Sequence, residues 1–248
     1  MKRMCTILLV LAICLAGCAV SSPGVEETAA QTSAPTTSAP TETQAATVPT
    51  TQATESAETV ETQAPEPADS DFVRVQDYLP EITVELRYAT ENNFTGQIIY
   101  EFTDAWLRYG TVKKLMDVQA ELAKSGLSLK IWDAFRPTQA QYKLWEVFPD
   151  PTYVANPING FSSHSRGNTV DVTLVDSTGA ELTMPTGFDD FTALADRDYS
   201  DCPPDAAANA QFLEQVMKEC GFIPYSGEWW HFSDEDSYPV EEDFYPPS

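Results

Sequence analysis

The chain of 248 residues contains 38 acidic and 14 basic side chains, which gives a formal net charge of -24 at pH 7. Because so negative a surface repels a phosphate backbone, this composition argues against a nucleic acid partner. The residues that follow position 70 suit one folded domain of ordinary size.

Residues 1–18 have the pattern of a bacterial export signal. Lys2 and Arg3 provide a positive start, and the apolar run from Thr6 to Ala16 is too short to span a bilayer. The signal ends in Leu-Ala-Gly-Cys18, which resembles the lipobox of bacterial lipoproteins. We therefore expect lipid on Cys18 and a protein held by that lipid alone on the outer face of the cell membrane. A plain secretory signal with an incidental cysteine is the alternative.

Residues 19–70 are rich in Thr, Ala, Pro, Ser, Glu and Gln and have scarcely any aromatic or large aliphatic side chains. Such a segment cannot bury enough apolar surface to fold, so we predict a disordered tether. At about 50 residues, the tether would span roughly 40 Å as a coil and up to about 150 Å when extended. A folded domain at residues 71–248 could then work at a distance from the membrane.

The folded part is predicted to mix strands and helices. Alternation of apolar and polar residues predicts strands, and helical spacing of apolar residues predicts helices. The predicted strands lie at 82–88, 127–131 and 169–174, and the predicted helices at 111–124, 138–148 and 205–218. Gly126 and Gly221 are expected to end the first and the last of these helices. Because the elements do not follow a strict strand-helix repeat, the predicted class is α+β.

Cys202 and Cys220 are the two cysteines that remain after the signal and its lipidation site. They flank the helix predicted at 205–218, whose ends are about 20 Å apart, whereas a disulfide requires Cα atoms within about 7 Å. We therefore expect two free, buried thiols.

Two histidines occur in the chain, His164 and His231, and each has a carboxylate nearby in sequence. The turn residues between His164 and the third predicted strand could fold it back beside Asp171 of that strand. Glu228 and His231 are three residues apart and would point to opposite faces of a regular strand. A helical turn or a bulge must therefore bring Glu228 and His231 together.

Two imidazoles and one carboxylate form the three-ligand set of a catalytic zinc ion, with water in the fourth position. The metal lowers the proton affinity of that water, and a nearby carboxylate such as Glu228 can take the proton. A single histidine is more often a structural residue than a ligand. Glu228 could likewise be a structural acceptor for a backbone amide or an arginine.

Arg136 follows the strand predicted at 127–131. Its guanidinium could stabilise the oxyanion that forms when hydroxide attacks a carbonyl group. A salt bridge with Asp133 is the alternative role. Trp229 and Trp230 are expected to form core or pocket wall rather than a site for aromatic ligands.

Five segments of the chain match, in order, the motifs of one known family. They are Arg87-Tyr88-Ala89-Thr90 with Asn93-Phe94-Thr95-Gly96, Trp132 to Pro137, Ser162 to Gly167 running on to Asp171-Val172-Thr173-Leu174, Met184 to Asp189, and Tyr225 to His231. Over residues 72–245 the chain resembles the D-alanyl-D-alanine dipeptidases of the VanX type. These zinc peptidases share a fold with D,D-carboxypeptidases and the hedgehog signalling domain. The resemblance implies a central, mostly antiparallel sheet with flanking helices.

The resemblance also implies roles for individual residues. It makes one zinc ion the cofactor, Glu228 the general base and Arg136 the group that stabilises the tetrahedral intermediate. The implied zinc ligands are His164, Asp171 and His231, and the implied neighbours of the substrate are Tyr88, Ser162 and Asp189. An acidic side chain such as Asp189 could bind the free ammonium group of a dipeptide.

We therefore predict zinc-dependent hydrolysis of D-alanyl-D-alanine outside the cytoplasmic membrane, by a zinc-bound hydroxide with Glu228 as general base. The first alternative is a D,D-carboxypeptidase or endopeptidase that trims peptidoglycan stem peptides. The segment between Pro137 and Ser162 is shorter than in the resistance dipeptidases, where it helps to roof a small cavity, and this favours longer substrates. A non-catalytic lipoprotein that binds the cell wall is the third hypothesis, although such a protein would be expected to have lost Glu228 or Arg136.

Overall fold

The computed structural model describes residues 65–248. The signal peptide predicted at 1–18, the lipidation site Cys18 and most of the tether predicted at 19–70 lie outside the described residues. Within residues 65–248, no helix combines the length and the hydropathy that crossing a membrane requires.

A five-stranded sheet with the order β2-β4-β5-β7-β6 forms the centre of the folded part. The pair of β2 and β4 is parallel, and the other three neighbouring pairs are antiparallel. The strands are β2 (Thr83–Val84), β4 (Leu127–Asp133), β5 (Thr169–Asp176), β6 (Phe222–Pro224) and β7 (His231–Asp234). A second, two-stranded sheet pairs β1 (Phe72–Arg74) with β3 (Trp106–Arg108). The predicted α+β class and the mostly antiparallel central sheet are confirmed.

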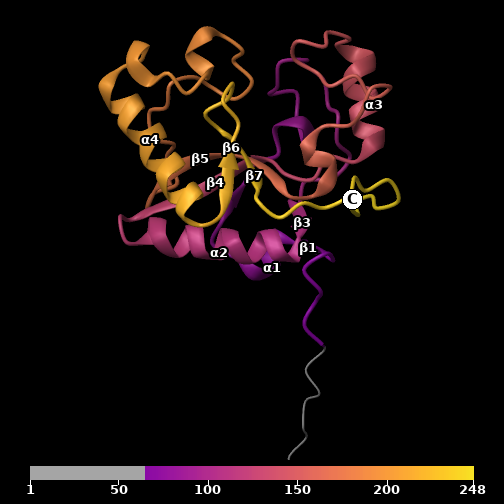
Figure 1. Ribbon diagram of the computed structural model, residues 1–248, viewed down its shortest axis with the longest axis horizontal. Helices are drawn as coiled ribbons and strands as arrows, with labels where there is room; N and C mark the ends of the chain where they lie inside the picture. Colours follow the sequence, from indigo (N-terminus) through magenta and orange to yellow (C-terminus); the bar gives the residue numbers. More distant parts are fainter. Residues whose placement is uncertain (1–64) are drawn as a thin grey trace, which may run out of the picture. The chain divides into compact units, whose positions relative to one another are not determined.

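Two long helices, α2 (Tyr109–Ala123) and α4 (Pro204–Glu219), pack against the sheet and against each other. The shorter helix α1 (Val75–Tyr78) contacts α2, and α3 (Thr138–Val147) lies apart from α2 and α4 (Figure 1). Four 3-10 turns connect these elements: η1 (Arg87–Ala89), η2 (Ser163–Arg166), η3 (Ala193–Ala195) and η4 (Tyr199–Asp201).

The central strand β5 is buried on both faces. Val170, Val172 and Leu174 belong to the hydrophobic core, as the alternating pattern predicts. The polar side chains between them, Thr169, Asp171 and Thr173, are buried as well. Burying a carboxylate costs free energy unless it has hydrogen-bond, ion-pair or metal partners. The polar face of β5 must therefore provide such partners for Asp171, and this makes it the candidate functional face.

Most of the predicted elements are confirmed to within two residues at each end, namely the three helices and the strands at 127–131 and 169–174. The strand predicted at 82–88 is wrong in its extent. β2 has two residues, and the chain then turns into η1. Leu86 and Tyr88 are both buried, and the turn brings the Tyr88 hydroxyl to Asp189.

Cys202 and Cys220 are free, as predicted, because they lie at opposite ends of α4. They are half-buried rather than buried, since each lies where the helix meets a surface loop.

Residues just before position 71 contact the folded domain. The Tyr109 hydroxyl donates to Glu66 Oε1 at 2.6 Å, and Lys113 Nζ lies 2.6 Å from Asp69 Oδ1.

Candidate active site

Sheet register places three chemically important side chains next to one another. In the antiparallel pair of β5 and β7, Asp171 lies directly opposite His231, the first residue of β7. On its other side, Asp171 lies opposite Asp133 at the end of β4, after a bulge in that strand. Directly opposed residues of antiparallel strands project from the same face of the sheet. The register therefore brings Asp133, Asp171 and His231 to one face.

His164 reaches this face from the turn η2. The backbone N–H of His164 donates to Ser162 Oγ at 3.4 Å, which caps the start of the turn. Gly167 ends the turn with a φ of 75°, and a Cβ atom on it would lie 2.4 Å from the Phe72 ring. Glycine is therefore required at Gly167 both by the backbone conformation and by the close approach of Phe72. The turn folds His164 back beside Asp171, as the sequence predicted.

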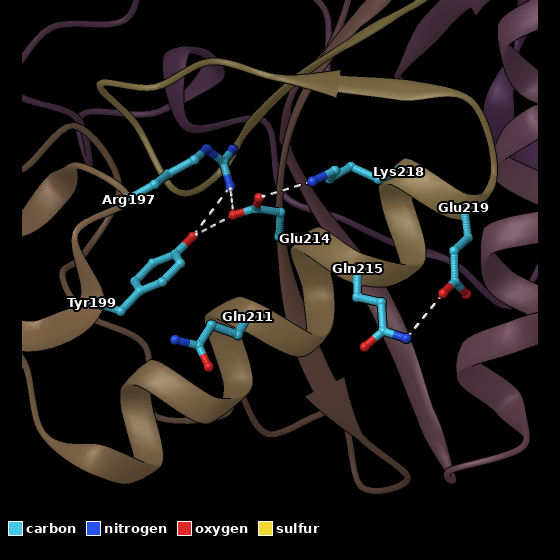
Figure 2. Close-up of a pocket in the computed structure, with 7 residues that line it drawn as sticks. All are labelled: Arg197, Tyr199, Gln211, Glu214, Gln215, Lys218 and Glu219. Carbon is cyan, nitrogen blue, oxygen red and sulfur yellow. Dashed lines mark hydrogen bonds and ion pairs between the residues drawn. The ribbon is translucent and has the colours of Figure 1, made fainter.

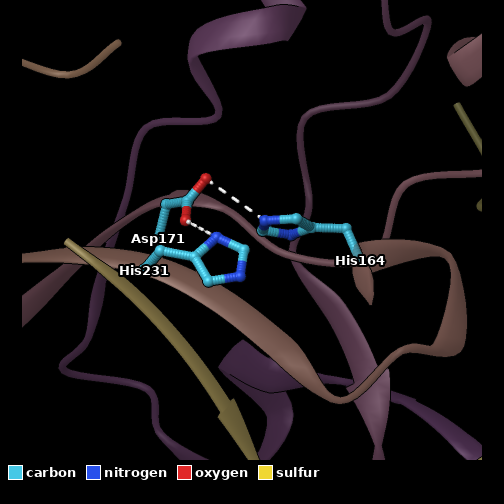
Figure 3. A group of neighbouring side chains, drawn as sticks. All are labelled: His164, Asp171 and His231. Atoms are coloured by element: carbon cyan, nitrogen blue, oxygen red, sulfur yellow. Dashed lines mark ion pairs between the residues drawn. The ribbon is translucent and has the colours of Figure 1, made fainter. Parts of the chain in front are cut away.

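The two imidazoles meet at the Asp171 carboxylate (Figure 3). His164 Nε2 lies 3.3 Å from Asp171 Oδ2, and His231 Nδ1 lies 3.0 Å from Asp171 Oδ1. One ligand atom from each of the three residues fits within 4.8 Å of the others, so the group could hold a metal ion. Asp171 Oδ1 is buried and accepts no well-aligned hydrogen bond, although His231 Nδ1 lies 3.0 Å away. A buried carboxylate oxygen without a well-aligned donor fits a bound cation.

Hydrogen bonds orient both rings toward such an ion. His164 Nδ1 lies 2.8 Å from the Ala134 carbonyl oxygen, which can only accept. Nδ1 must therefore carry a proton, so in the neutral ring the lone pair is on Nε2, which faces Asp171. On the second ring, His231 Nε2 lies 3.3 Å from Ser163 Oγ. If Nε2 donates to this hydroxyl, His231 Nδ1 also keeps a lone pair.

Electrostatics keep Asp171 ionised despite its burial. Burial opposes ionisation, but interactions with His164 and His231 outweigh it and hold the pKa of Asp171 below its ordinary value. The pKa of His164 is set in the same way, by its neighbours and against its burial. Burial lowers the pKa of His164, but Asp171 and Asp133 raise it, and the net shift is upward. These shifts describe a carboxylate that is available as an anionic ligand.

Glu228 lies beside His231, because a turn joins them. The His231 N–H donates to the Glu228 carbonyl at 3.3 Å, and Glu228 Oε2 lies 3.5 Å from His231 Nδ1. The predicted turn between these two residues is thus present. Trp229 and Trp230 occupy the turn and are fully buried, so they form core rather than pocket wall. Burial raises the pKa of Glu228, as does the nearby Asp171 charge, although His231 opposes this, and a raised pKa suits a general base.

Arg136 forms a salt bridge and also lines the pocket, while its role at an oxyanion stays a prediction. Its Nη2 donates to Asp133 Oδ2 at 2.7 Å, so the salt bridge considered as an alternative is present. Its Nε donates to the Tyr100 hydroxyl at 3.2 Å and its Nη1 to Gln141 Oε1 at 3.2 Å. Both terminal nitrogens retain another N–H, and Arg136 lines the same pocket as the histidines. Asp133 thus fixes a guanidinium that can still contact a ligand.

Asp189 is a half-buried carboxylate that a tyrosine hydroxyl contacts. Tyr88 donates to Asp189 Oδ2 at 2.7 Å. Burial raises the pKa of Asp189 well above its ordinary value, and the Asp171 charge raises it further. Among the described residues, no basic side chain forms an ion pair with Asp189, and its φ of 54° is unusual for a residue other than glycine. A carboxylate with an unusual backbone conformation, a raised pKa and no ion-pair partner is a feature of binding sites.

The predicted site residues come together around one pocket of about 320 Å³. The eight site residues predicted within the described chain line it: Tyr88, Arg136, Ser162, His164, Asp171, Asp189, Glu228 and His231. Their placement together is a property of the structure, whereas their individual roles stay predictions.

The family follows from comparison with known proteins. The Peptidase_M15 family, the D-ala-D-ala dipeptidases, matches residues 68–246. The chain belongs to this family. Its predicted nature as a metallopeptidase, and thus as an enzyme, is confirmed.

Three relatives in this family carry the name D-alanyl-D-alanine dipeptidase. That of Escherichia coli (strain K12) is 39% identical over 166 residues, which cover 66% of this chain and 86% of the relative. That of Streptomyces coelicolor is 32% identical over 198 residues, with coverages of 68% and 94%. That of Enterococcus faecalis is 28% identical over 196 residues, with coverages of 69% and 95%.

Several residues that line the pocket of this dipeptidase-family domain were not predicted from the sequence. They are Pro151, Thr152, Tyr153, Ala155, Ser163, Phe191 and Tyr225. Ser163 and Tyr225 lie within the recognised motifs, Ser163 beside His164 and Tyr225 three residues before Glu228. This closeness in sequence could have identified both as pocket residues. Residues 151–155 carry no motif, because a loop reaches the pocket through tertiary contacts that local sequence does not encode.

Proposed function

We propose that this protein is a zinc-dependent dipeptidase that hydrolyses D-alanyl-D-alanine. The observation that carries the proposal is the pocket itself. It brings a His-Asp-His group, the carboxylate of Glu228 and the guanidinium of Arg136 around one cavity of about 320 Å³. Family membership and the names of the relatives support the same substrate.

Zinc is the metal that this donor set favours. Two imidazole nitrogens and one carboxylate are typical of catalytic zinc sites, which leave one position open for water or substrate. The holding atoms would be His164 Nε2, His231 Nδ1 and the Asp171 carboxylate, whose Oδ1 lacks a well-aligned donor. A zinc ion bound there would supply Lewis acidity, which activates water and polarises the peptide carbonyl.

Glu228 and Arg136 carry the remaining steps. The Glu228 carboxylate accepts a proton as water attacks the carbonyl carbon, and then delivers that proton to the amine that leaves. As the carbon becomes tetrahedral, negative charge develops on the carbonyl oxygen. Arg136, held in place by Asp133 at 2.7 Å, stabilises this charge with the N–H groups that it has free. Because the guanidinium is fixed beforehand, little reorganisation accompanies the reaction.

Asp189 gives the pocket a preference for a free amino terminus. Its half-buried carboxylate has a hydroxyl donor in Tyr88, but among the described residues no basic side chain forms an ion pair with it, and the Arg136 charge acts only from a distance. The ammonium group of a dipeptide would provide the missing charge partner. Ser162, at the start of η2, contributes a hydroxyl to the same pocket. Recognition of an ammonium group favours a dipeptidase over an enzyme that trims the end of a longer chain.

The decisive experiment compares three substrates with the zinc-loaded protein: D-alanyl-D-alanine, its N-acetylated form and a peptidoglycan pentapeptide. Amine release from the free dipeptide alone is the expected result. Asp189→Asn should raise KM for the dipeptide, because it removes the charge that binds the ammonium group. Equal cleavage of the acetylated substrate would contradict the dipeptidase proposal.

A D,D-carboxypeptidase or endopeptidase acting on stem peptides is the second candidate. The observation that favours it is the exposure of the pocket rim, where Tyr153 is 41% and Tyr225 is 54% exposed. A longer peptide could leave the pocket between such side chains. Cleavage of the pentapeptide in the substrate comparison would establish this activity.

We also propose that the enzyme acts outside the cytoplasmic membrane, held there by lipid on Cys18. The support is the sequence of residues 1–18, which lie outside the described residues. In a bacterial host, the wild-type protein should fractionate with membranes and incorporate labelled palmitate. Cys18→Ala should abolish the label and release the protein, and a Cys18→Ala variant that still carries label would refute this anchor.

A further inference from the structure

A single guanidinium joins the two ends of the loop that carries Glu228. Arg197 lies between η3 and η4, and its Nε donates to the Tyr225 carbonyl at 2.7 Å. Its Nη2 donates to the His231 carbonyl at 3.0 Å. The Tyr225 N–H also donates to the His231 carbonyl, at 3.1 Å, so these two residues close the loop. Arg197 therefore binds the loop at the point where it leaves β6 and at the point where it enters β7.

The other side of Arg197 is anchored on α4 (Figure 2). Its Nη1 donates to Glu214 Oε2 at 3.1 Å and to the Tyr199 hydroxyl at 3.2 Å. Tyr199 also donates to Glu214 Oε2, at 3.1 Å. The Arg197 guanidinium lies over the Phe232 ring, 4.5 Å from its centroid. With its side chain 10% exposed and all three nitrogens bonded, Arg197 has one orientation available.

The loop needs this support because the ladder between β6 and β7 ends at the pair of Pro224 and Phe232. Beyond that pair, no β6–β7 ladder bond fixes the position of Glu228 relative to His231. Two other contacts reinforce the same link between segments. The Arg197 N–H donates to the Ser226 carbonyl at 3.3 Å, and the Trp229 N–H donates to the Ala195 carbonyl at 2.8 Å.

We infer that Arg197, anchored by Glu214, is a positioning residue that sets the placement of Glu228 and His231 relative to each other. This inference rests on the proposed function, in which His231 is a zinc ligand and Glu228 the base. Arg197 does not line the pocket of about 320 Å³ that holds these groups. It lines a separate surface cavity of about 400 Å³ together with Glu214 and Lys218, so it acts through the loop backbone.

The test uses the full chain and compares four variants with the wild type. Arg197→Ala removes the guanidinium, and Arg197→Lys keeps the charge but cannot bond both carbonyls at once. Glu214→Gln removes the charged anchor. Lys218→Gln is the matched control, because Lys218 lies in the same cavity, is 57% exposed and reaches Glu214 at 3.7 Å without contacting the loop.

Three measurements are made on each variant. Competition with a chromophoric chelator gives the zinc affinity, steady-state kinetics give kcat and KM for D-alanyl-D-alanine, and thermal unfolding gives the melting temperature. Arg197→Ala should lower zinc affinity and kcat by about 10- to 100-fold, the usual effect of removing a residue that orients a metal ligand. KM should change little. Arg197→Lys and Glu214→Gln should shift the same quantities less, and Lys218→Gln should match the wild type. Guanidinium ion at a concentration that does not denature the protein should partly restore kcat to Arg197→Ala.

A purely structural role for Arg197 predicts a different result. Folded variants with a lower melting temperature but wild-type zinc affinity and kcat would overturn the inference. If Arg197→Ala does not fold, Arg197→Lys and Glu214→Gln decide the question by the same criteria. A wild-type protein that binds no zinc would overturn the proposed function and this inference together, whereas a wild type that binds zinc and cleaves the dipeptide leaves only the role of Arg197 at stake.

Discussion

The metal-ligand side of the pocket and its loop wall are held in place by different kinds of interaction. The ligand side consists of the proposed zinc ligands His164, Asp171 and His231, of which Asp171 and His231 are opposed in the register of β5 and β7. The loop wall consists of Pro151, Thr152, Tyr153, Ala155 and Phe191, none of which lies in a strand or helix.

Local turn bonds and side-chain packing, rather than a sheet ladder, hold the loop wall: the Tyr153 and Val154 N–H groups donate to the Asp150 carbonyl. The Gln141 amide donates to the Ala155 carbonyl at 2.8 Å, Val154 is buried, and the Tyr153 and Phe191 rings lie 4.8 Å apart. A strand in the middle of a sheet is fixed by many backbone bonds that break together, whereas a loop fixed by a few side chains can open locally. The ligand side should therefore be intolerant of substitution, and the loop wall should adjust.

The largest effect is expected from Asp171→Ala. It removes the carboxylate that lies within 3.3 Å of both histidines and leaves them without their common partner. Zinc content should fall to background and kcat/KM by about ten-thousandfold, or roughly 5.5 kcal/mol of transition-state stabilisation. Metal analysis and amine release measure the two effects. Thr173→Val is the control, because Thr173 lies buried on the same face of β5, and zinc retained by Asp171→Ala would show that the ligand set is wrong.

Glu228→Ala should have a smaller effect on rate and leave the metal bound. Glu228 contacts His231 at 3.5 Å but lies in a turn outside the sheet, so the sheet-borne ligands keep their positions without it. We expect kcat to fall by about a hundredfold to a thousandfold, which is the usual contribution of a general base. Zinc analysis of the same sample separates this variant from Asp171→Ala. An unchanged rate would rule out Glu228 as the base.

The ligand side could be predicted from the sequence because its determinants are local. His164 reaches Asp171 through a turn whose residues are contiguous with β5, and Glu228 reaches His231 across three residues. In each case the two functional side chains and the turn residues between them lie in the same short segment. The family motifs cover the same segments.

The remaining parts of the pocket depend on contacts between distant segments. Asp133 lies beside Asp171 because of a bulge in β4 and the register of two strands about 40 residues apart, which alternation alone does not specify. η1 replaces a predicted strand because the Tyr88 hydroxyl bonds to Asp189, 101 residues later. Tyr153 and Phe191 face the pocket from loops without motif or periodicity, so no sequence rule selects them.

Gly167→Ala tests how far the ligand side depends on the conformation of the turn that carries His164. The substitution adds a Cβ at a φ of 75° and 2.4 Å from the Phe72 ring. Backbone strain and overpacking together should lower the free energy of unfolding by about 3 kcal/mol. Urea unfolding monitored by tryptophan fluorescence measures this.

Gly126→Ala is the matched control for Gly167→Ala. Gly126 has a similar φ of 70°, but nothing lies within 4 Å of the added Cβ. It should cost about 1 kcal/mol from backbone strain alone. Equal losses for the two variants would mean that Phe72 yields easily and that the turn bearing His164 is less constrained than the ligand side requires.

The smallest effect is expected from Tyr153→Ala in the loop wall. Tyr153 is 41% exposed and contacts Phe191 across the pocket rim, so its removal opens the rim without disturbing the sheet. KM for D-alanyl-D-alanine should rise by about threefold with kcat unchanged, the signature of lost uniform binding. The free energy of unfolding should change by about 0.5 kcal/mol or less. If kcat instead falls as far as in Glu228→Ala, the loop wall takes part in positioning the reacting groups, and the contrast between the two sides of the pocket does not hold.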